Sequence, residues 1–325
     1  MYGGSVISCA VDARARCRIE SCETLTFDVS GEFQSIDLDK NLNLCGDRLD
    51  VARAAFSYLV DFHKTGQTSK VAIEFPMRCC FKLTAETDVP MQAGLAGSTA
   101  ILTAIMAAIL SYSNVEWNNW QLAEMVGECE FHRMGIICGY QDQYMTSLGG
   151  LNYMDFRGKE KLQHKPGTEP FATVESLSKH VNELPMLLAH TGVSRHSGKV
   201  HKSVRLRWEE GEPLVVKSME RIAELARVGK GALLSKDWQT VGELMNENHA
   251  IVRELGGSGE SNECLIKAAL EGGAIGAKLA GAGGGGTIIV LTLDPQTTKD
   301  ALQKAGAEQF LALSPSSSGV TVKWI

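Results

Sequence analysis

The sequence predicts an α+β fold in two domains, and three observations support this prediction. The chain has 325 residues, a length that suits two domains better than one. Strand-like and helix-like patterns are mixed along it without the regular alternation of a parallel α/β sheet. A stretch rich in proline, threonine and lysine at 161–173 has the composition of a linker. We therefore predict one domain over residues 1–172 and a second over residues 173–325.

The first half of the chain is predicted to combine short strands with three helices. Alternating apolar and polar residues indicate three strands that we expect to form an antiparallel meander, at 5–11, 15–20 and 25–29. Two more strands and three helices follow, with strands at 70–75 and 79–84 and helices at 47–63, 98–110 and 118–134. Asn118 is expected to cap the last of these helices.

The second half is predicted to be richer in helix. Long helical patterns occupy 213–235 and 238–254, and short apolar strands are expected at 186–190 and 287–292. The second of these strands follows directly after a glycine cluster at 281–286.

Composition argues against several classes of partner. A net charge of −6 and a pI near 5.8, without a block of basic residues, argue against nucleic-acid binding. No apolar stretch approaches the ~20 residues of a membrane span. Nine cysteines without C-x-x-C spacing suit reduced thiols in a cytoplasmic protein.

The most informative segment is a glycine-rich loop, residues 89–100, that leads into an uncharged apolar helix. The first turn of a helix has free backbone N–H groups and a positive dipole end, and glycines let an anion approach them closely. The hydroxyls of Ser98 and Thr99 can hold a phosphate-bound Mg²⁺ or cap the helix. The alternative is an ordinary tight turn at the start of a core helix.

The second glycine cluster has five glycines in the six residues 281–286. Neither cluster has the Walker pattern or the dinucleotide-binding pattern of glycines. The second one can act as a hinge or can clear space for a ligand, and its entropic cost favours the ligand.

Two acidic residues between the clusters, Glu130 and Asp142, are candidates for catalysis. Glu130 falls near a predicted helix end, and Asp142 follows a glycine-bounded loop. In phosphoryl transfer one carboxylate can hold Mg²⁺ while another orients or deprotonates the attacking hydroxyl. The alternative is that both are helix caps or solvated side chains.

Three motifs in order, P-x-x-x-G-L-x-G-S-[S/T]-A, E…G-x-Q-D-x-x…G-G and K-x-x-G-[A/S]-G-G-G-G, resemble those of the GHMP small-molecule kinases. The match covers about residues 90–325, and within that superfamily the likeness is greatest to the glucuronokinase family. The heptose-7-phosphate kinase branch shares the style of the loop at 191–195. The resemblance implies an N-terminal domain like ribosomal protein S5 domain 2, a ferredoxin-like C-terminal domain and an active site between them.

The resemblance also implies roles for single residues. Ser98 and Glu130 would hold Mg²⁺, and Asp142 would act as the base. The ATP phosphates would be bound by the loop residues Pro90, Gly94, Leu95, Ala96, Gly97, Ser98, Thr99 and Ala100. The acceptor would be bound by Asp142 together with Tyr2, Gly3, Arg195, Ser197, His201, Gly281, Gly283, Gly284 and Gly285.

The expected function is that of a cytoplasmic sugar kinase, a monomer or homodimer, that uses ATP and Mg²⁺. D-Glucuronate is the expected acceptor, phosphorylated at its anomeric hydroxyl. One departure from the family matters: residues 1–5 resemble only the end of its first motif, so we expect the first strand to be missing. Three alternatives therefore stay open: another GHMP sugar kinase such as a heptose-7-phosphate kinase, a catalytically impaired binding protein of this fold, and an enzyme that binds a non-nucleotide anion.

Overall fold

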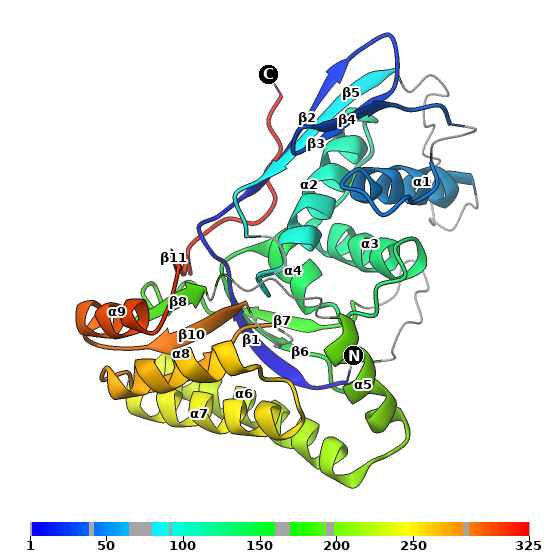
Figure 1. Cartoon of the computed structure of the whole chain (residues 1–325). Coiled ribbons are helices and arrows are strands. Elements are labelled where there is room, and N and C mark those ends of the chain that lie inside the picture. Colours follow the sequence, from blue (N-terminus) through cyan, green and yellow to red (C-terminus); the bar gives the residue numbers. More distant parts are fainter. Residues whose placement is uncertain are drawn as a thin grey trace.

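The computed structural model describes residues 2–38, 42–64, 80–90, 93–159, 170–190, 192, 198–281 and 286–324. These residues form three β-sheets and the helices that cover them (Figure 1). In the described part of the chain, no helix is long and apolar enough to span a membrane.

The first sheet has three strands in the order β1–β6–β7. Its strands are β1 (Ser5–Cys9), β6 (Leu151–Asp155) and β7 (Thr173–Ser176). β1 pairs antiparallel with β6, so that Ser8 lies opposite Asn152. β7 follows the predicted domain boundary in sequence but pairs with β6, which precedes it. The division at residues 172 and 173 therefore stays a prediction.

The second sheet has the order β2–β5–β3–β4 and belongs to the N-terminal half of the chain. Its strands are β2 (Ala15–Ser21), β5 (Phe81–Thr87), β3 (Thr26–Val29) and β4 (Glu32–Ser35). β3 pairs with β5 in parallel, and β2 pairs with β5 rather than with β1. The expected antiparallel meander over residues 5–29 is therefore wrong, although strands do form at all three predicted positions.

The same half of the chain contains the helices α1 (Asp50–Lys64), α2 (Gly97–Tyr112), α3 (Asn119–His132) and α4 (Gln141–Leu148). The aromatic side chains of Phe27, Phe56 and Phe81 pack together with Leu102 and Ile105 of α2 in a core that excludes water. α2 is apolar around much of its circumference because it lies between the sheet and the neighbouring helices. This buried helix holds the end of the glycine loop in place.

The C-terminal sheet has the order β11–β8–β10–β9. Its strands are β8 (Met186–His190), β9 (Gly276–Leu279), β10 (Thr287–Leu291) and β11 (Gln309–Ala312). The helices of this part are α5 (Gly198–Glu209), α6 (Pro213–Ser235), α7 (Trp238–Glu254), α8 (Glu260–Glu271) and α9 (Pro295–Lys304). α6 and α7 pack on one face of the sheet, and α8 and α9 pack on the other (Figure 1).

Most of the predicted elements are confirmed. The strand at 186–190 and the helices at 213–235 and 238–254 have the predicted bounds. Asn118 caps α3 through hydrogen bonds from the backbone N–H groups of Trp120 and Gln121. The predicted strand at 70–75 and most of the predicted linker lie outside the described residues.

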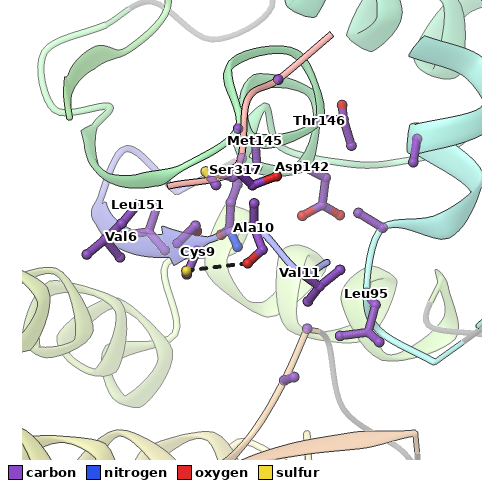
Figure 2. A pocket seen from close by; sticks show the side chains of 18 of the residues that line it. Val6, Cys9, Ala10, Val11, Leu95, Asp142, Met145, Thr146, Leu151 and Ser317 are labelled. Carbon is purple, nitrogen blue, oxygen red and sulfur yellow. Dashed lines mark hydrogen bonds between the residues drawn. The ribbon is translucent and has the colours of Figure 1, made fainter. Parts of the chain in front are cut away.

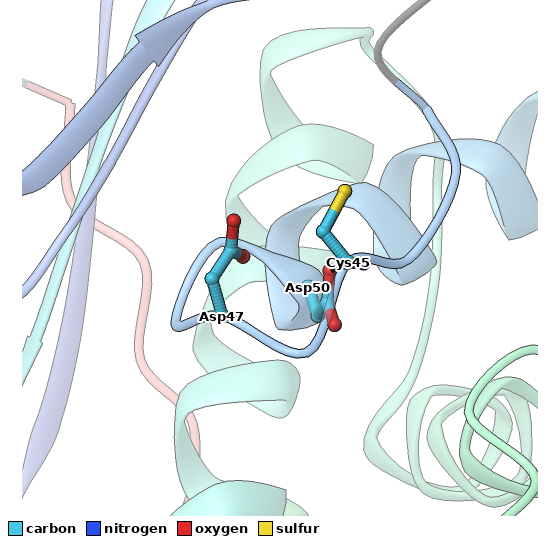
Figure 3. A group of neighbouring side chains, drawn as sticks. All are labelled: Cys45, Asp47 and Asp50. Carbon is cyan, nitrogen blue, oxygen red and sulfur yellow. Dashed lines mark hydrogen bonds between the residues drawn. The ribbon is translucent and has the colours of Figure 1, made fainter.

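A cluster of side chains away from the glycine loops joins the loop before α1 to the first turn of that helix. Cys45, Asp47 and Asp50 lie close together there (Figure 3). The buried Arg53 donates hydrogen bonds of 2.6 Å to Asp47, 2.8 Å to Asp50 and 2.7 Å to Gln34. Asp50 also accepts from the backbone N–H groups of Cys45 and Gly46. Arg53 offsets one of the two negative charges, and these bonds tie both carboxylates to the start of α1, so the cluster is a structural one.

Candidate active site

The two glycine clusters meet in the structure, as their shared chemistry suggests. Gly94 has a φ of +74°, and a Cβ built there would lie 2.9 Å from the carbonyl oxygen of Ala280. A Cβ on Gly281, whose φ is +66°, would lie 2.9 Å from the carbonyl oxygen of Gly94. Because any side chain would separate the two backbones, glycine is required at both positions. The loop before α2 and the loop after β9 therefore form one unit.

The N-terminus of α2 has no side-chain cap. Ala96 occupies the cap position in the left-handed conformation with a φ of 57°, and no acidic residue lies in the first turn. The backbone N–H groups of this turn therefore point away from the helix without a side-chain acceptor among the described residues. Such a turn binds anions, and phosphate is a common ligand.

Glu130 is held directly beside this helix end. Its carboxylate is 3% exposed and accepts a hydrogen bond of 2.7 Å from the hydroxyl of Thr99. Gln143 and the thiol of Cys138 also donate to it. Removal from water raises the pKa of Glu130, while these donors and the nearby Asp142 have smaller effects. The carboxylate thus has neutral donors and lacks a cationic partner in the described part of the chain.

The structure also distinguishes between the two hydroxyl residues of the loop. The resemblance implies that Ser98 and Glu130 hold Mg²⁺ together. Among the described contacts, the hydroxyl that donates a hydrogen bond to the carboxylate of Glu130 is that of Thr99. Thr99 is 6% exposed, whereas Ser98 is partly exposed. Successive helix positions point about 100° apart, so only one of the two side chains can face α3.

Asp142 lies in the first turn of α4, and its carboxylate points into a large cavity (Figure 2). The cavity has a volume of about 1350 Å³ and is lined by both halves of the chain. Asp142 is exposed to the space of the cavity, and the surrounding protein raises its pKa by limiting the water around it. A raised pKa brings a carboxylate nearer to the working pH of a general base.

The cavity brings together many of the predicted residues. Tyr2, Gly94, Leu95, Ala96, Ala100, Asp142 and Gly281 all line it. Pro90, Gly97, Ser98, Thr99 and Glu130 are positioned around the loop without lining it, and Gly3 precedes the lining residue Gly4. Arg195, Ser197, Gly283, Gly284 and Gly285 lie outside the described residues, and His201 lies in α5 without a described side chain.

Sequence reasoning missed three residues of this region. Gln143 and Cys138 bind the carboxylate of Glu130, and Lys278 lines the cavity. Gln143 follows the predicted Asp142 directly, and Lys278 is the first residue of the third glycine motif. Both therefore lie in sequence motifs that pointed to the site. Their side-chain directions depend on how α4 and β9 pack, which no local pattern gives.

The comparisons with known proteins agree with this arrangement. The model of the GHMP kinases N terminal domain matches residues 58–150, and that of the GHMP kinases C terminal matches residues 230–310. Probable glucuronokinase 2 of Arabidopsis thaliana is 35% identical over 63% of this chain and 55% of its own length. Glucuronokinase 1 of the same plant is 32% identical over 72% of this chain and 64% of its own length.

Two more distant proteins cover nearly the whole chain. The D-glycero-alpha-D-manno-heptose 7-phosphate kinase of Campylobacter jejuni is 24% identical over 95% of this chain and 87% of its own length. The Lactococcus lactis galactokinase, solved in complex with galactose, has a TM-score of 0.78 at 15% identity, covering 98% of this chain and 90% of that one. This second likeness supports the fold alone.

The two family models cover one region in each half of the chain, and the joined glycine loops lie between these halves. The chain belongs to the GHMP kinase family. The predicted family and its two-domain α+β fold are thereby confirmed. The matched regions span 55% and 64% of the two plant relatives.

Proposed function

We propose that this chain is an ATP-dependent kinase that phosphorylates D-glucuronate at its anomeric hydroxyl. The observation that carries the proposal is the arrangement around the glycine loop. An uncapped helix N-terminus lies beside a buried carboxylate, Glu130, and a second carboxylate, Asp142, opens into the adjoining cavity. The likeness to the two plant glucuronokinases supports the choice of acceptor.

The donor set around Glu130 fits Mg²⁺. Carboxylate and hydroxyl oxygens are the ligands that this ion prefers, and a buried carboxylate bonded only to neutral donors gains from a cation. Glu130 with the hydroxyl of Ser98 or Thr99 would hold the ion. When bound, Mg²⁺ neutralises charge on the phosphates of ATP.

The protein residues have separate tasks in this proposal. The backbone N–H groups at the start of α2 bind the phosphates, and the loop after β9 supports them through its contact with Gly94. Asp142 accepts a hydrogen bond from the acceptor hydroxyl and takes its proton as the acceptor oxygen bonds to the γ-phosphorus. The bond from that phosphorus to the bridging oxygen breaks, and ADP leaves. Phosphoryl transfer needs little covalent help, so positioning supplies most of the rate acceleration.

A heptose 7-phosphate is the second candidate acceptor. The relative from Campylobacter jejuni that carries this substrate in its name aligns with 95% of the chain, a larger share than either glucuronokinase. Its lower identity of 24% makes it the second choice.

The proposal is tested by ADP release from Mg·ATP with a panel of acceptors. The panel contains glucuronate, galacturonate, galactose, fucose, a heptose 7-phosphate and mevalonate. Glucuronate is expected to give the highest kcat/KM. A higher value for the heptose 7-phosphate would transfer the assignment to the second candidate. Mg·ATP binding without turnover on any acceptor would indicate an impaired binding protein, and protection from thermal unfolding by inorganic phosphate alone would indicate a non-nucleotide site.

A further inference from the structure

Lys278 occupies an unusual position in the C-terminal sheet. It lies on β9 directly opposite Ile289 of β10, on the sheet face that packs against α6 and α7. Its side chain is half-buried and lines the large cavity beside Met245, Asn248 and Val252 of α7. Lysine side chains are mostly exposed in folded proteins.

No acid pairs with Lys278 among the described residues. Within the described part of the chain, its ammonium group donates a hydrogen bond of 2.8 Å to the carbonyl oxygen of Leu279. Burial lowers the pKa of Lys278 to about 8, and no charged neighbour contributes to this shift. Four other basic residues line the cavity wall. Arg16 pairs with Asp88, and Arg18 pairs with Glu20. Arg14 donates to the backbone carbonyl oxygens of Ser318 and Gly319, and Lys323 is exposed near the C-terminus.

Asp142 and Lys278 are two groups of opposite charge in the cavity wall, and no described ion pair joins them. Asp142 enters it from α4 and Lys278 enters it from β9. Burial shifts the pKa of each group, and the described contact of the Lys278 ammonium group is with the carbonyl oxygen of Leu279 rather than with Asp142. Lys278 also lies three residues before Gly281, whose backbone contacts Gly94 of the phosphate-binding loop. A ligand bound between these groups meets a hydrogen-bond acceptor at one end and a cation at the other.

We propose that Lys278 binds the acidic group of the acceptor and thereby selects acidic sugars over neutral ones. The inference rests on the proposed function, since it assigns a part of the acceptor to a part of the same cavity. An ammonium ion forms a strong charge-assisted hydrogen bond with a carboxylate. A neutral sugar would leave the ammonium group without a charged partner, which disfavours its binding.

The test compares Lys278→Met and Lys278→Arg with the wild-type chain. Lys267→Met is the matched control, because Lys267 is an exposed lysine of α8 whose described ion pair is with Glu271 of the same helix. Binding of glucuronate, glucose and Mg·ATP is measured by titration calorimetry, and kcat and KM are measured by ADP release. Glucose is the neutral counterpart, with a hydroxymethyl group in place of the carboxylate.

Lys278→Met is expected to weaken glucuronate binding by about 10- to 100-fold, the range of a hydrogen bond between charged groups. Affinity for Mg·ATP and kcat/KM for glucose should stay within about twofold of wild type, and Lys278→Arg should recover most of the glucuronate affinity. Equal glucuronate affinity of the wild type and Lys278→Met would overturn the inference, as would a loss confined to Mg·ATP. Failure of the wild type to bind glucuronate would overturn it as well. Absence of ADP release with every acceptor would refute the kinase proposal alone, because the binding comparison does not depend on turnover.

Discussion

Replacing Gly94 by alanine tests whether the contact between the two glycine loops matters for function. Two costs arise at this position. A non-glycine residue in the left-handed region, here at a φ of +74°, costs about 1–2 kcal/mol. The added Cβ would also lie 2.9 Å from the carbonyl oxygen of Ala280 and has to move by about 0.5 Å to reach an ordinary contact of 3.4 Å. Crowding of this kind costs about 1–3 kcal/mol.

Gly158→Ala separates these two costs. Gly158 has a φ of +70° in an exposed turn, and a Cβ there would meet no atom within 4 Å. The control is expected to lose about 1–2 kcal/mol of stability and no activity. Gly94→Ala is expected to lose about 2–5 kcal/mol and, through displacement of the phosphate-binding loop, about 10-fold in kcat/KM for ATP. Chemical denaturation measures the first effect, and ADP release with saturating acceptor measures the second.

Three results would refute this reasoning. Equal stability of Gly94→Ala and Gly158→Ala would show that the loops separate without cost. Unchanged kcat/KM for ATP in a folded Gly94→Ala protein would show that the contact does not position the nucleotide. Gly281→Ala tests the same contact from the other loop, because its Cβ would lie 2.9 Å from the carbonyl oxygen of Gly94. A double variant whose losses add fully would contradict a shared contact.

Three further predictions concern single side chains. Asp142→Asn is expected to lower kcat by about 10²- to 10⁴-fold, and an unchanged kcat would show that Asp142 is not the base. The wild-type rate should fall as the pH drops through the raised pKa of Asp142, since only the ionised carboxylate accepts a proton. Thr99→Ala should weaken Mg·ATP binding more than Ser98→Ala, because Thr99 bonds to Glu130; identical titrations would contradict this. Arg53→Met should cost about 3 kcal/mol at pH 7. Because Arg53 lowers the pKa of Asp47, that difference should shrink as pH falls below about 4, and a constant difference would contradict the ion-pair account.

Local patterns predicted helices better than they predicted sheets. α6 and α7 were predictable over their full length because helix periodicity and capping depend on nearby residues. Strand positions were predictable for the same reason, but strand partners were not. β1 finds its partner β6 nearly 150 residues away, and β3 runs parallel to β5, so the assumption of sequential pairing failed.

In the candidate site too, residues could be singled out from the sequence, but their contacts could not be predicted. The glycine loop, Glu130 and Asp142 were predictable from residue type and order. The bond from Thr99 to Glu130 depends on the rotation of α2 against α3, which the residue order does not specify. Likewise, the isolation of Lys278 from any described acid follows from the packing of β9 on α7.

The most direct test of the central claim is a ³¹P NMR spectrum of the chain incubated with Mg·ATP and D-glucuronate. The account predicts a new resonance of a sugar 1-phosphate that grows in proportion to ADP and is absent for Asp142→Asn on the same timescale. Conversion of ATP to ADP and free phosphate alone, or a phosphate ester on another hydroxyl, would contradict it.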